Sequence, residues 1–282
     1  MEMNHYLNKI CLACLLLSLT GCTTLTAILP TATVESPFIN KSTERPNEFV
    51  LRTEPGVEFK LVQNASERPL QIQNPPSVVA RGFRLSDPKT SDLSLGLPLF
   101  GVHFRAASRF QYGVMTLPTA IWFSQFGFVV RGMVKYLIFE SADEIHSLSA
   151  FGHLTWSYSQ LSGNQKVLFG PGGYPWRAHA DVVAPNLGIS YGYRSSPKLT
   201  SYLGFAYQDF KVSGQVNQDV STTGDSPSAE TKLSPTSGFS KALQVGLTMG
   251  EAQSFDLSYS YTEVRWQDFQ NQIHFLSFGF RL

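Results

Sequence analysis

Hydrophobic and polar residues alternate along three stretches near the C-terminus, at positions 239–249, 255–263 and 274–282. In the last stretch, Phe278 and Phe280 alternate with small or charged residues. Successive side chains of a β-strand point to opposite faces, so each stretch has one apolar face and one small or polar face. A tilted strand crosses a bilayer in about 9–11 residues, close to the length of each stretch. The pattern predicts three consecutive membrane strands.

The same two-residue period continues upstream and raises the expected number of strands to about ten. The stretch at 126–140 also fits an amphipathic helix, because Arg131 and Lys135 are four residues apart. Its many β-branched and aromatic residues favour a strand. We therefore predict an all-β fold, an antiparallel up-and-down transmembrane β-barrel of about ten strands, with about eight or twelve as alternatives. The other predicted strands lie at 77–85, 93–104, 113–123, 148–159, 186–194 and 203–208.

The lengths of the connections support this count. Short connections at 195–198 and 250–253 alternate with long ones at 161–180 and 212–237. Outer-membrane barrels have short periplasmic turns, longer external loops and an even number of strands. We expect both ends of the barrel domain in the periplasm and the two long loops outside, where they would contact any cell-surface partner.

The final strand resembles the closing strand of bacterial outer-membrane barrels, which carries apolar residues at every second position back from an aromatic C-terminus. Phe278 and Phe280 fit this pattern, whereas Leu282 replaces the terminal aromatic residue and His274 interrupts the apolar series. The resemblance implies the outer membrane of a Gram-negative bacterium, with membrane lipid as a partner.

The N-terminus carries an export signal. An apolar run at 10–19 follows Lys9 and ends in Leu19-Thr20-Gly21-Cys22, which resembles a bacterial lipobox. The resemblance implies acylation of Cys22 and, because Thr23 follows it, sorting to the outer membrane. An ordinary signal peptide with a chance cysteine is the alternative. The expected organisation is a signal peptide at 1–21, a flexible lipid-anchored tether at 22–47, a short periplasmic segment at 48–76 and the barrel at 77–282. Within the periplasmic segment, two short alternating pieces at 48–63 predict a small hairpin or a plug.

Composition narrows the function classes. The net charge is +1, so no electrostatic feature of the whole chain suggests nucleic acid as a partner. All three cysteines lie within the first 22 residues, and no cysteine–histidine cluster follows them. We therefore expect no metal and no cofactor.

The polar face of the strands is the expected lining of the lumen. A barrel of about ten strands has little free lumen, because about eight strands are just filled by side chains. The lining is then either a rigid core of ion pairs and hydrogen bonds or a narrow solute path. This favours a non-enzymatic role in envelope structure or small-solute passage. The lining residues are Arg131, Lys135, His153, Arg194, Gln244 and Asp256.

Two alternatives remain open. If Tyr261 pairs with Leu276, Glu263 lies opposite His274 on the outer face, a pair similar to that of outer-membrane acyl hydrolases. However, Ser277 has the wrong parity to act as their nucleophile. The second alternative is a soluble periplasmic lipoprotein barrel that turns its aromatic residues inward and binds an apolar ligand.

Overall fold

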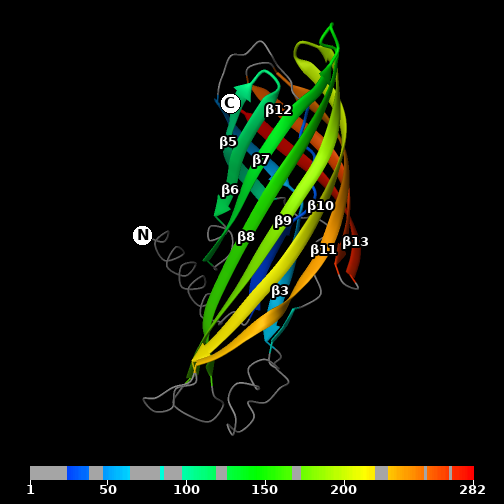
Figure 1. The fold of residues 1–282 in the computed structure, drawn as a ribbon. Coiled ribbons are helices and arrows are strands. Elements are labelled where there is room, and N and C mark those ends of the chain that lie inside the picture. Colours follow the sequence, from blue (N-terminus) through cyan, green and yellow to red (C-terminus); the bar gives the residue numbers. More distant parts are fainter. Residues whose placement is uncertain are drawn as a thin grey trace, which may run out of the picture.

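The protein is a closed antiparallel β-barrel of ten strands with a second, three-stranded sheet (Figure 1). The barrel order is β10-β11-β12-β13-β2-β5-β6-β7-β8-β9, and the small sheet has the order β1-β3-β4. The predicted fold and strand number are thus confirmed. The computed structural model describes residues 24–37, 47–63, 83–85, 97–118, 126–166, 173–219, 228–250, 253–266 and 269–282.

The barrel wall is built from short strands on one side and long strands on the other. The short strands are β2 (Asn47–Glu54), β5 (Leu97–Ala107), β6 (Phe110–Pro118), β12 (Ser254–Trp266) and β13 (Phe269–Arg281), with β7 (Phe126–Glu140) intermediate. The long strands are β8 (His146–Lys166), β9 (Gly173–Ser196), β10 (Leu199–Asp219) and β11 (Ser228–Met249). The small sheet contains β1 (Thr24–Pro30), β3 (Gly56–Gln63) and β4 (Phe83–Leu85).

One wall strand differs from those predicted. Strand β2 pairs with β5 along its whole length and with β13 at Gly279–Arg281, so it belongs to the barrel rather than to a periplasmic segment. Residues 83–85, expected in the wall, pair instead with β3. The alternation of this stretch is visible in the sequence, but it is short and includes Arg52 and Glu54, which face inward. It therefore fitted a small hairpin or a plug outside the wall as well as a wall strand.

The two predicted long loops are largely strand. Pairing in the β8–β9 hairpin continues to Lys166 and Gly173, and in the β10–β11 hairpin to Asp219 and Ser228. These strands have 21 to 24 residues, about twice the length that crosses a bilayer, so the hairpins project beyond the rest of the wall (Figure 1). Their projecting parts lack alternation in sequence, so the two-residue period did not extend the predicted strands this far.

The opposite end of the barrel carries short connections, as predicted. Strand β9 ends at Ser196 and β10 begins at Leu199, while β11 ends at Met249 and β12 begins at Ser254. The C-terminus lies at this same end (Figure 1). We call it the turn end, and the end with the projecting hairpins the hairpin end.

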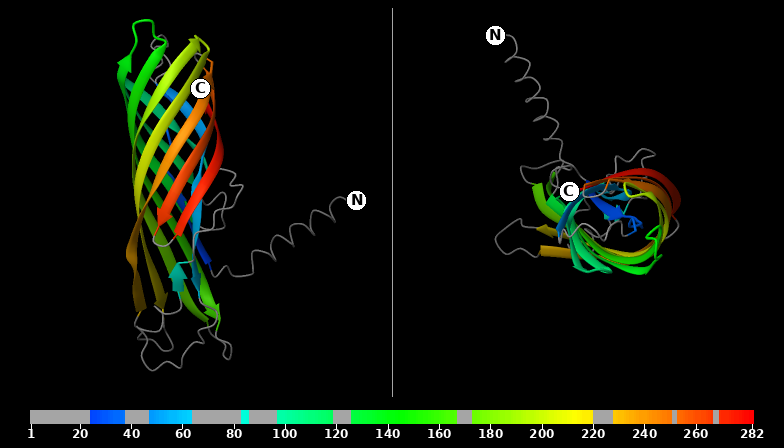
Figure 2. Two further views of the ribbon diagram at one scale, coloured as in Figure 1. Left: turned by 90° about the vertical axis from the view of Figure 1, so that its right-hand side faces the viewer. Right: turned by 90° about the horizontal axis from the view of Figure 1, so that it is seen from above.

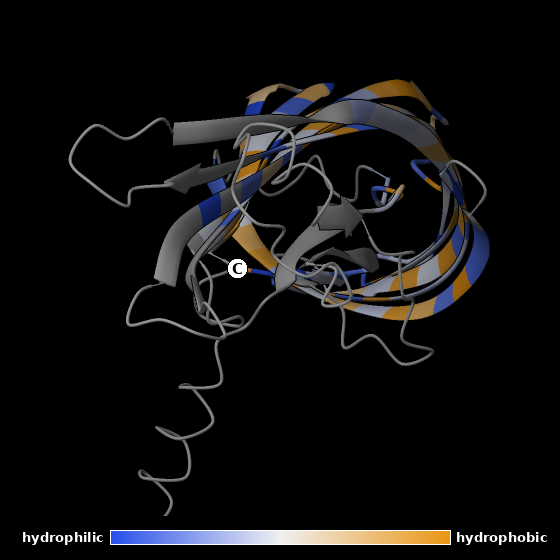
Figure 3. Ribbon diagram, turned by 90° about the horizontal axis from the view of Figure 1, so that it is seen from below, coloured by the Kyte–Doolittle hydropathy of each residue, from blue (hydrophilic) through white to orange (hydrophobic). Residues whose placement is uncertain are grey.

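The barrel exterior is apolar and its interior is polar. Leu187 is 71% exposed and Leu276 is 51% exposed on the outer surface, whereas Thr155, Ser190 and Thr262 are buried inside. Apolar and polar residues alternate along the wall strands (Figure 3). Closure pairs the backbone groups that lipid cannot satisfy, and the apolar exterior matches hydrocarbon. The structure is therefore a membrane-spanning β-barrel of the outer-membrane type. The soluble alternative requires small polar residues on the outside, whereas large apolar and aromatic side chains such as Trp156 and Phe278 are exposed there.

No helix in the described part of the chain is long and apolar enough to cross a membrane.

The N-terminal part of the described chain lies inside the barrel. Strand β1 contacts the inner faces of β8 and β9 and pairs with β3 from Thr24↔Val62 to Pro30↔Gly56. Residues 31–37, here called the plug segment, continue from β1 toward the turn end and are all buried. The view from above shows this blue chain within the ring of wall strands (Figure 2). Residues 24–37 are therefore not the flexible tether that the sequence suggested.

Candidate functional site

The plug segment is an extended chain with one apolar and one polar side. Ala32 and Val34 form an apolar cluster with Phe151, Ala206 and Ala242 of the wall. Wall glycines provide the space for this contact. A Cβ atom on Gly204 would lie 2.2 Å from Val34 Cγ1, and one on Gly192 would lie 2.6 Å from Pro37 Cγ. Such distances are impossible for real atoms, so the segment packs against glycine backbone.

Wall side chains satisfy the backbone of the plug segment, which has no strand partner there. The amide of Ala32 donates to Ser240 Oγ at 2.8 Å. Asn186 Nδ2 donates to the Thr33 carbonyl at 2.9 Å, and Lys135 Nζ donates to the Ser36 carbonyl at 3.1 Å. Buried backbone groups need such partners, and these come here from β7, β9 and β11. The segment is therefore seated at a defined position.

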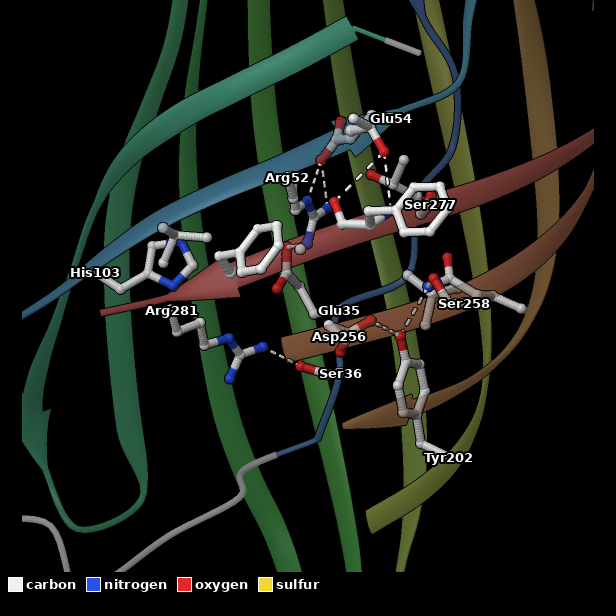
Figure 4. A pocket seen from close by; sticks show the side chains of 18 residues that line it. Glu35, Ser36, Arg52, Glu54, His103, Tyr202, Asp256, Ser258, Ser277 and Arg281 are labelled. Carbon is white, nitrogen blue, oxygen red and sulfur yellow. Dashed lines mark hydrogen bonds and ion pairs between the residues drawn. The ribbon is translucent and has the colours of Figure 1, made fainter. Parts of the chain in front are cut away.

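Glu35 connects the plug segment to a buried ion network. Its Oε1 atom lies 2.7 Å from Arg52 Nη1 and 3.1 Å from His153 Nε2. Arg52 also pairs with Glu54, and Glu54 pairs with Arg131. Figure 4 shows Arg52 between the carboxylates of Glu35 and Glu54. Because charges this deeply buried need partners, the network fixes Glu35 in the lumen.

Hydrogen bonds to uncharged side chains orient two members of the network. Arg131 Nε donates to Thr155 Oγ1 at 2.9 Å, and its Nη1 donates to Thr33 Oγ1 at 3.2 Å. The Asn186 amide, 2.9 Å from His153 Nδ1, is a donor, so the proton of the neutral imidazole is assigned to Nε2, which faces Glu35. Arg131 Nη2 has no hydrogen-bond partner among the described residues.

A small cavity lies beside the Glu35 carboxylate (Figure 4). Its volume is about 30 Å³, which holds a water molecule or two but no organic solute. His103 lines it and, within the described chain, neither of its ring nitrogens has a hydrogen-bond partner. On the far wall, Asp256 accepts hydrogen bonds from Tyr202 at 2.7 Å and from Thr248 at 2.9 Å. Beside the Glu35 carboxylate, the described residues therefore leave a space too small for an organic solute.

Five of the six predicted lining residues lie inside the barrel. Arg131, Lys135, His153 and Gln244 are buried inside the barrel, and Asp256 lines the cavity. Arg194 lies at the turn end, 3.5 Å from Glu144.

Glu35, Arg52 and Glu54 were not among the predicted site residues. Both regions that carry them had been assigned outside the barrel. The available signals were weak: an acidic residue in a run of small and apolar residues at 31–37, and two opposite charges two residues apart in β2.

The structure does not bring the predicted catalytic pair together. Tyr261 pairs with His274 and Glu263 pairs with Gln272, two residues away from the predicted register. The Tyr259 hydroxyl lies 2.5 Å from His274 Nδ1, while Glu263 accepts a hydrogen bond from Arg265 at 2.7 Å. A slip of two residues keeps every side chain on its face, so alternation could not reveal it.

Two expectations concern other chemistry. Among the described residues, no group of three or more histidine, cysteine, aspartate or glutamate side chains could hold a metal ion. The lipidation site predicted at Cys22 lies outside the described residues, which begin at Thr24.

Comparisons with known proteins give only distant structural likenesses. No family model and no curated protein matches the chain. The outer-membrane protease OmpT from Escherichia coli has a TM-score of 0.38 at 8% identity, covering 92% of this chain and 93% of that one. OccK1 (OpdK) from Pseudomonas aeruginosa has a TM-score of 0.17 at 11% identity, covering 92% and 96%. Likenesses this distant support no argument about residue roles.

Proposed function

We propose that this protein is an outer-membrane barrel whose own plug segment closes a polar lumen, and that small solutes pass when the segment leaves its seat. The observation that carries the proposal is the complete burial of residues 31–37 across the lumen. The segment is held by side chains rather than by a strand ladder, so it can leave without breaking the barrel wall. A permanently closed structural barrel is the alternative.

Conductance in planar lipid bilayers tests the proposal. In a linker variant, seven Gly and Ser residues replace residues 31–37, which removes Glu35 and the apolar contacts of Val34 but keeps the chain length. We expect the native protein to be closed for most of the recording and the linker variant to show discrete, long-lived conducting steps. The reason is that the seat of the segment then fills with water.

The control is gel mobility of the unboiled and boiled protein, which reports a folded barrel. A folded linker variant that stays closed would contradict the proposal, as would native protein that conducts as well as the linker variant. A second control replaces 141–145, an exposed turn, with Gly and Ser, and should leave the conductance of the native protein unchanged.

We further propose that the lipid anchor at Cys22 lies on the hairpin side of the barrel. Strand β1 runs from Thr24 toward the turn end, so Thr24 is its end nearer the projecting hairpins. Cys22 is two residues before Thr24, a span of about 7 Å at most. If the short turns face the periplasm, the anchor is on the external side of the membrane. The sequence predicted that both the N-terminus and the short turns face the periplasm, and this placement of the anchor allows only one of the two.

Cysteine labelling of intact cells distinguishes the two sides. A membrane-impermeant maleimide should label Arg177→Cys, an exposed site on the projecting part of β9 at the same end as Thr24, in intact cells, whereas Ala142→Cys, in an exposed turn at the opposite end, should react only after permeabilisation. The reverse pattern would place the short turns outside. Equal labelling of the two variants in intact cells would show that they do not lie on opposite sides of the membrane.

A further inference from the structure

The wall around Glu35 carries an excess of positive charge. Arg52, Arg131, Lys135 and Arg281 contact the plug segment or its ion network. The wall carboxylates at this level are Glu54 and Asp256. Glu48 also belongs to this level, because it accepts a hydrogen bond at 3.3 Å from Gln111, which pairs with Lys135 across β6 and β7. With Glu48 included, four cationic groups face three wall carboxylates. Glu35 therefore supplies a negative charge that the wall itself lacks.

We propose that the seat of the Glu35 side chain is a binding site for small organic carboxylates, with Glu35 as its built-in occupant. The proposal rests on the proposed function, because a solute reaches the seat only when the plug segment leaves. An incoming carboxylate then replaces Glu35 between Arg52 and His153.

The donors at the seat suit a carboxylate. A guanidinium presents a planar fork of donors that matches the two oxygens of a carboxylate, and such charge-assisted bonds are stronger than neutral ones. His153 supplies a second donor, its Nε2 atom, to which the imidazole proton is assigned. Nε2 lies 3.1 Å from Glu35 Oε1, the oxygen that a bound carboxylate would replace. Two further polar groups near the seat have no hydrogen-bond partner in the described chain: Arg131 Nη2 and the ring nitrogens of His103. They are available to a second polar group of a bound solute.

The opposite side of the same seat is apolar. When Ala32 and Val34 leave, they uncover Phe151, Ala206 and Ala242 beside the backbone of Gly204. A solute with a carboxylate at one end and a short aliphatic body at the other would contact both sides. Inorganic anions would use only the polar side, and neutral or cationic solutes would leave the guanidinium groups unpaired.

The test uses the linker variant in planar bilayers. In a KCl gradient, its reversal potential should show that chloride is several times more permeant than potassium. Butyrate should then reduce the chloride current at a severalfold lower concentration than butyramide, which has the same shape without the charge. Arg52→Gln in the linker variant should remove this difference, whereas the matched change Arg265→Gln, on the outer face of the barrel, should keep it.

The outcomes separate the two proposals. A folded linker variant that does not conduct overturns the proposed function itself. A conducting but cation-selective linker variant, or equal effects of butyrate and butyramide, overturns only the carboxylate site. If Arg52→Gln does not fold, Lys135→Gln in the linker variant takes its place and should lower the preference for butyrate severalfold; an unchanged preference would overturn the site.

Discussion

Glu54→Ala is expected to lower the free energy of unfolding by about 3–5 kcal/mol, the effect of removing one partner from a buried ion pair. Glu54 is shared by two buried guanidinium groups, those of Arg52 and Arg131. Glu35 can still compensate Arg52 from the plug segment, but in the described chain Arg131 pairs with no other carboxylate. The substitution therefore leaves a cation in the barrel interior without its counter-charge.

Urea unfolding in lipid vesicles, followed by tryptophan fluorescence, measures this effect. The matched control is Glu263→Ala, which removes an exposed pair with Arg265 and should change the free energy by about 1 kcal/mol or less. Adding Arg131→Met to Glu54→Ala should restore much of the loss, because it removes the unpaired charge. A loss below about 1 kcal/mol for Glu54→Ala would show that the network does not hold the barrel together.

Leu187→Arg is expected to destabilise the barrel in a bilayer by about 2–4 kcal/mol, the cost of an arginine at the centre of the lipid-facing surface. Leu187 is 71% exposed and lies midway along the outward apolar residues of β9, which extend from Val183 to Tyr193. On a barrel surrounded by water, the same change would stay within about 0.5 kcal/mol. The large expected effect thus depends on lipid around this face.

The same vesicle unfolding assay measures this change. The control is Ser237→Arg, at an exposed site on β11, where the outward Lys241 nearby shows that charge is accepted at this level. It should cost about 1 kcal/mol at most. Equal, small effects of the two substitutions would contradict a membrane position for the centre of β9.

Much of the wall could be predicted because its information is local. Each side chain of a strand faces lipid or lumen according to its parity, so the outward position of Leu187 and the inward position of Ser190 follow from the chain alone. The short connections at 195–198 and 250–253 likewise followed from local composition. The count of ten strands was right, although β2 replaced the predicted strand at 77–85.

The pairing register of β12 and β13 could not be predicted from the alternation of apolar and polar residues. The observed pairing of Glu263 with Gln272 and the predicted pairing with His274 present the same faces to lipid, so both satisfy the alternation equally. Hydrogen bonding between particular neighbours, such as Tyr259 with His274, distinguishes them, and it exists only once the strands are paired.

The sequence by itself determined that the chain forms a barrel of about ten strands with an apolar exterior, because a two-residue period and the hydrophobic effect act on each strand separately. Only the tertiary structure decided what fills the lumen. Glu35 and Arg52 lie 17 positions apart, and Glu35 and His153 far more, so no periodicity relates them. These residues meet only when the barrel closes around the plug segment. In the barrel interior the dielectric constant is low, so each buried charge needs an oppositely charged partner.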